Sequence, residues 1–156
     1  MNAASLFVLD TDILIFLIRG LKKSCASPEH IAKAMGVLRR IQDTQAAGGI
    51  TGVSAITVAE LEFGAAKSAS PEKERRAVTR ILTPFELFPF SPFSVPRHYG
   101  EIRLALEKQG SMIGAMDLLI AAHARSLGAK LVTNNLRDFG RIEGLECENW
   151  TIGERK

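Results

Sequence analysis

The sequence predicts an α/β protein in which a central parallel sheet of about four to five strands carries helices on both faces. Short apolar segments alternate along the chain with longer segments of helical periodicity, which is typical of parallel strands joined by crossover helices. The first apolar segment, residues 6–9 (LFVL), has no polar position at all, as expected of a strand that is buried on both faces. The length of 156 residues suits one domain. We assign it to residues 1–150, followed by a short tail at 151–156.

The first third of the chain is expected to form two strands, over residues 6–9 and 50–53, and the helices that follow them. An apolar helix over 13–18 has N-cap candidates in Thr11 and Asp12 and is expected to stop at Gly20. A long amphipathic helix over 28–47 starts with a proline and ends at a pair of glycines. Its expected core face carries Ile31, Met35, Leu38 and Ile41. A third helix begins after the strand at 50–53, with Ser54 as its cap.

The rest of the chain is expected to alternate in the same way. Ser70 and Pro71 mark the start of a fourth helix as its cap and first residue. A strand over 86–90 lies in a segment rich in proline and phenylalanine, residues 83–96. Helices over about 96–109 and 114–127, a strand over 130–133 and a last strand near 145–148 complete the sheet.

Composition excludes several classes of protein. Hydrophobic residues make up 46% and charged residues 24% of the chain, which is ordinary for a globular domain. Two cysteines far apart in the sequence, Cys25 and Cys147, fit neither a disulfide scaffold nor a cysteine zinc site and suit a reducing cytoplasm. The longest uninterrupted apolar run, residues 13–18, is far too short to cross a bilayer. A net charge of +3 permits an anionic partner without demanding one.

The informative residues are acids in apolar surroundings. Asp10 ends a wholly apolar strand, and ligands of parallel sheets bind at the carboxyl ends of the strands; a helix cap is the simpler alternative role for Asp10. Asp117 is the one acid between Glu107 and Asp138 and has mostly apolar helical neighbours. A charge there is costly unless it is paired, hydrogen-bonded or bound to a metal, so a structural ion pair is the alternative for Asp117.

Two further segments carry candidates. In the helix that follows Ser54, both Glu60 and Glu62 have largely apolar neighbours three and four positions away, and periodicity does not choose between them. Beyond the strand at 130–133, Asn135 and Asp138 lie near the same expected sheet edge, with an Asx turn as the alternative. Several acids gathered at one edge repel each other unless a cation lies among them, and oxygen ligands of this kind suit Mg²⁺ or Mn²⁺. Mg²⁺ commonly bridges to phosphate, so phosphoryl chemistry is expected.

Five segments in this order resemble the PIN-domain ribonucleases, and among them the VapC-type toxins of bacterial toxin–antitoxin pairs. They are LDTDILI at 9–15, SAITVAELEFGAAKS at 54–68, YGEIRLALEKQG at 99–110, IGAMDLLIAAHARSLGAKLVTNNLRDFGRI at 113–142, and Trp150. The resemblance covers the chain from end to end. It departs from the compact members of the family in the longer helical region at 28–47.

The resemblance implies a PIN-like fold and assigns roles to the candidates. The metal-binding aspartates of the family fall on Asp10 and Asp117, and its glutamate falls on Glu60 rather than Glu62. The fourth polar position is either Asn135 or Asp138, and Asp12 occupies a position that looks structural. The implied activity is Mg²⁺-dependent cleavage of RNA, of tRNA or rRNA, with Mn²⁺ able to substitute. The implied partners are a VapB-like antitoxin and a second copy of the chain.

Two alternatives belong to other functional classes. Asp10-Thr11-Asp12 formally matches the D-x-D motif of haloacid-dehalogenase-like phosphatases, but the segment around Asp117 lacks the later acid pair of those enzymes. A PIN-like binding module without a metal is the other alternative. A binding module without a metal would have no functional need for acids in apolar helices.

Overall fold

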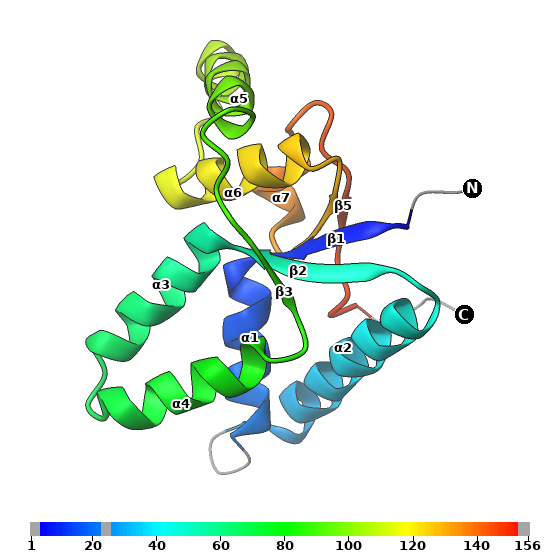
Figure 1. The fold of residues 1–156 in the computed structure, drawn as a ribbon, viewed down its shortest axis with the longest axis vertical. Helices are drawn as coiled ribbons and strands as arrows, with labels where there is room; N and C mark the ends of the chain where they lie inside the picture. Colours follow the sequence, from blue (N-terminus) through cyan, green and yellow to red (C-terminus); the bar gives the residue numbers. More distant parts are fainter. Residues whose placement is uncertain (1–3, 23–25, 153–156) are drawn as a thin grey trace.

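The computed structural model describes residues 4–22 and 26–152. Its centre is a sheet of five parallel strands in the order β3-β2-β1-β4-β5 (Figure 1). The strands are β1 (Leu6–Leu9), β2 (Ile50–Ser54), β3 (Glu86–Phe88), β4 (Lys130–Val132) and β5 (Cys147–Glu148). The predicted fold class and parallel sheet are confirmed. Two strands are shorter than expected. Residues 89–90 do not continue β3, and residues 145–146 do not belong to β5.

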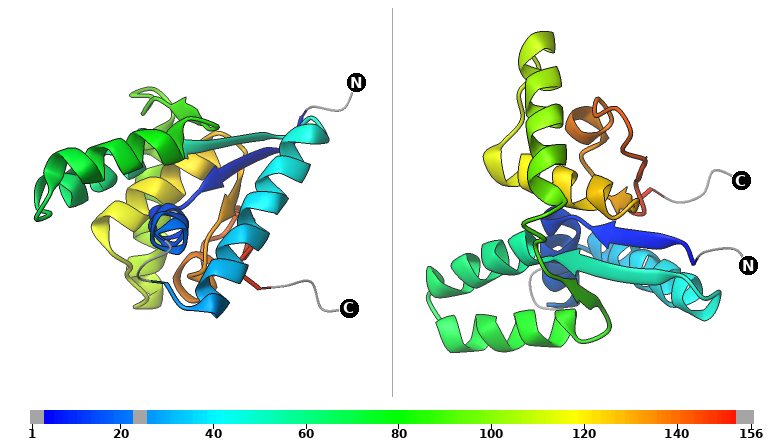
Figure 2. Two further views of the ribbon diagram at one scale, coloured as in Figure 1. Left: turned by 90° about the horizontal axis from the view of Figure 1, so that it is seen from below. Right: turned by 45° about the horizontal axis from the view of Figure 1, so that its top comes forward.

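Helices cover both faces of the sheet, as predicted. One face carries α1 (Thr11–Leu21), α2 (Pro28–Ala46), α3 (Ala55–Ala66) and α4 (Pro71–Leu82), and the other carries α5 (Val95–Gln109), α6 (Ala115–Ser126) and the short α7 (Leu136–Phe139) (Figures 1 and 2). Successive side chains of β1 point alternately into two hydrophobic cores, one on each face of the sheet. Phe7 and Leu9 pack with α1 and α2, whereas Val8 packs with α5 and α6. The absence of polar positions in β1 is explained by this alternation.

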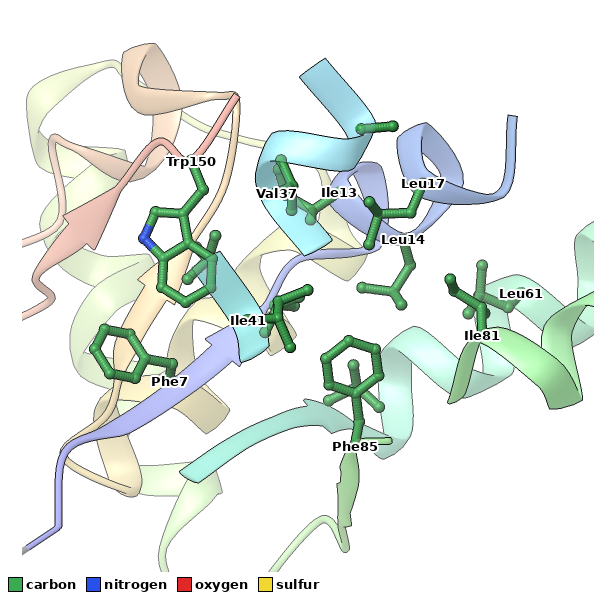
Figure 3. Close-up of a cluster of buried hydrophobic side chains, with 14 of the residues drawn as sticks. Phe7, Ile13, Leu14, Leu17, Val37, Ile41, Leu61, Ile81, Phe85 and Trp150 are labelled. Carbon is green, nitrogen blue, oxygen red and sulfur yellow. The ribbon is translucent and has the colours of Figure 1, made fainter. Parts of the chain in front are cut away.

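The hydrophobic core beneath α1 and α2 includes Trp150, near the C-terminal end of the chain. Phe7 meets Trp150 with a distance of 5.3 Å between ring centroids, and the side chains of Ile41 and Phe85 lie in the same cluster (Figure 3). Trp150 thus packs against the first strand through Phe7. Residues 153–156 of the expected tail lie outside the described residues.

Four local expectations are corrected. Helix α1 does not stop at Gly20 but continues to Leu21, because Gly20 is a contact point: a Cβ there would lie 2.5 Å from the Cβ of Ala34 on α2. The cap of α1 is Asp10, not Thr11 or Asp12. On α2, Met35 is about half exposed, and the buried residues are Ala34, Val37 and Ile41. The sequence did not predict α7.

The remaining helix starts agree with expectation. Ser54 caps α3 through a hydrogen bond that its side chain accepts from the Ile56 amide, and Ser70 precedes Pro71 at the start of α4 without a side-chain cap bond. Among the described residues no helix is long and apolar enough to span a membrane.

Candidate active site

The carboxyl ends of β1 and β4 bring Asp10 and Thr133 together across the sheet. Asp10 caps α1, and its side chain is only 1% exposed. Its Oδ1 accepts a hydrogen bond from the Thr11 amide at 2.7 Å, and its Oδ2 accepts one from the Thr133 hydroxyl at 2.9 Å. Both oxygens are therefore held by the protein, and the carboxylate has one orientation.

Burial is costly for this carboxylate. It raises the pKa of Asp10 from 3.8 to about 7, against the lowering effect of the Thr133 hydrogen bond, and the charges of Asp12 and Asp117 raise it further. The raised pKa means that the surroundings of Asp10 disfavour its charged form, despite the two hydrogen bonds that it accepts. Asp10 is therefore the cap of α1, and it also lies at the sheet edge where the candidate site is expected.

Asp117 lies at the start of α6 and faces the same region. It is half-buried, and burial raises its pKa from 3.8 to about 6, with further contributions from the charges of Asp12, Glu60 and Asp138. No cationic side chain among the described residues pairs with Asp117. The ion pair weighed as an alternative is therefore absent from that part of the chain, and four separate elements direct negative charge at one place.

Glu60 and Glu62 are distinguished by their surroundings. The Oε1 of Glu60 accepts a hydrogen bond of 2.7 Å from the hydroxyl of Thr11, the first residue of α1. Glu62 points to another part of the surface, where its Oε2 pairs with Arg75 at 3.2 Å and its side chain is 45% exposed. Glu60 is thus the glutamate at the sheet edge, and Glu62 is a surface acid.

Asn135 and Asp138 form a local pair. Asn135 caps α7 by accepting a hydrogen bond from the Asp138 amide at 3.3 Å, and its Nδ2 donates to Asp138 Oδ2 at 3.0 Å. The backbone amide of Asn135 also donates to the hydroxyl of Thr133 at 2.9 Å. Thr133 thereby links the Asn135–Asp138 pair to Asp10. The Asx turn weighed for this segment is therefore present, and it places the Asp138 carboxylate where its charge acts on Asp117.

Four residues of this region were missed or set aside by sequence reasoning. Thr11, Thr57 and Thr133 supply the hydroxyl groups around the acids, and Asp12 adds charge to both Asp10 and Asp117 although it looked structural. A threonine one turn before Glu60 and another directly after β4 were the available signals. Neither stands out, because threonine is common at helix starts and strand ends.

The donor set fits a hard divalent cation. Its acids offer only oxygen. Burial, and to a smaller extent the charges of neighbouring acids, raise the pKa of Asp10 and of Asp117, and a bound cation would favour the charged form of both. Across residues 4–22 and 26–152, no three acidic, histidine or cysteine side chains converge closely enough to enclose a metal ion.

Comparisons with known proteins identify the class. The family model described as PIN domain matches residues 7–145. Ribonuclease VapC2 of Haemophilus influenzae is 40% identical over 144 residues, covering 92% of this chain and 97% of that protein. The tRNA(fMet)-specific endonuclease VapC of Shigella flexneri is 34% identical, with 93% and 98% covered.

Solved structures agree. The crystal structure of VapBC2 from Rickettsia felis bound to a DNA fragment from their promoter matches with a TM-score of 0.77 and 33% identity, over 93% of this chain and 98% of that one. The crystal structure of DNA-bound VapBC from Salmonella typhimurium also has a TM-score of 0.77, with 33% identity. The chain therefore belongs to the PIN-domain family of metal-dependent nucleases. Within it, the chain is a VapC-type endoribonuclease of the toxin class. The phosphatase and the non-catalytic module are set aside.

Proposed function

We propose that this endoribonuclease uses Mg²⁺ to hydrolyse RNA phosphodiester bonds at the edge formed by Asp10, Glu60 and Asp117. The observation that carries the proposal is the pair of raised pKa values, about 7 for Asp10 and about 6 for Asp117. Carboxyl groups strained in this way gain most from a bound divalent cation. Mn²⁺ is expected to replace Mg²⁺, because it accepts the same oxygen ligands.

The side chains have separate roles in this proposal. Asp10 and Asp117 would hold the ion, and Glu60 would be a further ligand or would orient the attacking water. The ion supplies charge stabilisation at the phosphate and lowers the pKa of a bound water. Asp138 is proposed as the fourth polar group because its charge reaches Asp117. Asn135 holds Asp138 in place through its amide.

The proposed substrate is tRNA, with rRNA as the other RNA considered. The support is the Shigella flexneri relative, which is named for cleavage of a tRNA and matches 93% of this chain. We also propose that the protein acts in the cytoplasm, where such a substrate is found. The sequence resemblance and the family's activity toward RNA support that localisation.

The proposed partner is a VapB-like antitoxin, since the solved relatives are VapBC complexes. A groove of about 700 Å³ offers it a place beside the acids. Asp12 and Glu60 lie in its lining with Phe63, which is 66% exposed, and Lys67. A segment that combines apolar side chains with a cation would complement this groove and cover the acids. A homodimer is also proposed, and exposed apolar residues such as Phe93 and Leu104 give it contact surface.

The test is cleavage of purified tRNA and rRNA by the whole protein in Mg²⁺, Mn²⁺ and EDTA. We expect specific fragments of tRNA with either metal and none in EDTA. Cleavage of rRNA alone would overturn the proposed substrate, and unchanged cleavage in EDTA would overturn the metal site. Hydrolysis of p-nitrophenyl phosphate is expected to be absent. Addition of the antitoxin encoded beside the gene should stop cleavage.

A further inference from the structure

Two buried threonines connect the first strand to the helix that carries Glu60. Thr11 is the first residue of α1 and is 5% exposed, and Thr57 on α3 is fully buried. Their Oγ1 atoms lie 3.0 Å apart, and the Thr11 Oγ1 lies 2.7 Å from Glu60 Oε1. Thr57 is one helical turn before Glu60, so both side chains meet Thr11 from the same face of α3.

The chemistry of these groups fixes the order of the hydrogen bonds. A carboxylate only accepts, so the single hydroxyl hydrogen of Thr11 goes to Glu60. Thr11 then has lone pairs left for the hydroxyl hydrogen of Thr57. The chain runs from Thr57 through Thr11 to Glu60, and its last bond is charge-assisted and therefore the stronger one.

Thr11 also touches the other acid. Its backbone amide donates to Asp10 Oδ1 at 2.7 Å, so one residue contacts a carboxylate on each side of the edge. The amide survives any side-chain substitution other than proline. The hydroxyl can therefore be removed without disturbing the bond to Asp10.

We propose that Thr11 is a positioning residue, whose hydroxyl, supported by Thr57, orients the Glu60 carboxylate relative to Asp10. The proposal rests on the role given to Glu60 above. With one Glu60 oxygen held by Thr11, the other is presented to the ion or its water. Loss of such a supporting hydrogen bond costs 10- to 100-fold in metal affinity or activity in metal sites generally, and about that loss is expected here.

The test compares Thr11→Val, Thr11→Ser and Thr57→Val in the full-length protein. Valine keeps the shape of threonine but lacks the hydroxyl, and serine restores it. We expect Thr11→Val to lower kcat for RNA about 10- to 100-fold with KM within about twofold, and Thr11→Ser to stay within about threefold of the native enzyme. Thr57→Val should show a smaller loss in the same direction. Thr79→Val is the matched control, because Thr79 lies on the exposed face of α4 and its hydroxyl bonds only a backbone carbonyl.

A double-mutant cycle provides a readout that a purely structural role would not move. Mn²⁺ affinity is titrated by calorimetry for Thr11→Val in the native and in the Glu60→Gln background. We expect a roughly tenfold weakening in the first and less than about twofold in the second, since the hydroxyl acts through the carboxylate. Equal weakening in both backgrounds, or no rescue by serine, would overturn the proposal. If Glu60→Gln itself retains native cleavage and Mn²⁺ affinity, the proposed role of Glu60 fails first, and Thr11 loses its role with it.

Should Thr11→Val unfold, Thr57→Val carries the same cycle. Its interaction with Glu60→Gln must then be non-additive in Mn²⁺ affinity. Additive losses would count against the hydroxyl chain as directly as they would for Thr11.

Discussion

Asp10 and Asp117 face the same edge of the sheet but are held in opposite ways. Asp10 is 1% exposed, and both of its oxygens accept hydrogen bonds, from the Thr11 amide and the Thr133 hydroxyl. Asp117 is half-buried on a helix face, and among the described residues no side-chain donor bonds to it. Burial nevertheless raises the pKa of both. The protein thus orients the Asp10 carboxylate by its own hydrogen bonds, whereas the Asp117 carboxylate has no such side-chain partner among the described residues.

The difference shows how this site reconciles stability with chemistry. In the proposed site, a carboxylate with fixed hydrogen bonds would set the position of a cation, while an acid without side-chain partners would be able to adjust as RNA and metal bind. Both arrangements disfavour the charged carboxylate, chiefly through burial and additionally through the charges of neighbouring acids, Asp12 for both and Glu60 and Asp138 for Asp117. Each prediction below changes one side of this comparison.

The largest expected effect is on cleavage, where the two acids should behave alike. Asp10→Asn and Asp117→Asn should each lower kcat for RNA by more than about 10³-fold, roughly 4 kcal/mol of transition-state stabilisation. The reason is that each removes a proposed metal ligand. Single-turnover assays in Mg²⁺ measure this, with Asp43→Asn on the exposed side of α2 as the matched control. A variant that retains more than a tenth of native cleavage has been wrongly placed in the site.

The second effect is a pH dependence of the unfolding free energy that arises from Asp10. The folded pKa of Asp10 is raised, so its contribution to stability is present below about pH 4 and is lost as pH rises through about 7. In EDTA, the unfolding free energy of the native protein relative to Asp10→Asn should fall over this range by on the order of 3 kcal/mol. Urea unfolding at several pH values tests this. Taking the difference cancels His123, whose pKa is lowered by burial and whose effect has the opposite sign.

If the difference in unfolding free energy between the native protein and Asp10→Asn did not change with pH, the pKa of Asp10 would not be raised in the folded protein. That result would also remove the main argument for a cation at this place. Repeating the series in Mn²⁺ should abolish the slope, because the bound ion stabilises the charged form.

The third effect concerns Asp117 without metal. Asp117→Asn should leave the fold in EDTA equally stable or more stable by about 1 kcal/mol, because asparagine removes a charge that its neighbours oppose. The gain is small since the side chain is partly exposed and screened. Urea midpoints in EDTA provide the measurement. A loss of about 3 kcal/mol, together with retained cleavage in Mg²⁺, would instead indicate a structural ion pair.

The smallest effect distinguishes two glutamates on one helix. Glu62→Gln removes an exposed pair with Arg75 and should change stability by less than about 0.5 kcal/mol, with cleavage within about twofold. Glu60→Gln should abolish cleavage. The same RNA assay on both variants decides, and equal behaviour would mean that the motif has been placed on the wrong residue of α3.

Much of this molecule could be predicted from the sequence because its elements are locally encoded. Apolar β1, the Ser54 cap and Pro71 at the start of α4 gave the positions of strands and helices. Predictions failed where a distant contact overrode a local rule. Gly20, a usual helix stop, lies inside α1 because Ala34 of α2 packs too close for a side chain, and Met35 is exposed because Ala34 and Val37 face the core instead.

The sequence by itself determined the parallel α/β fold and made Asp10 and Asp117 candidates, because a carboxylate in an apolar segment is visible in one dimension. It left Glu60 and Glu62 equivalent by periodicity, and only the family resemblance chose Glu60. Only the tertiary structure decided how the acids of the site are held. Thr133 reaches Asp10 across 123 positions of chain, and Thr11 reaches Glu60 across 49. A hydroxyl that serves a distant carboxylate leaves no periodic or compositional trace, since its geometry exists only once the sheet has brought the strand ends together.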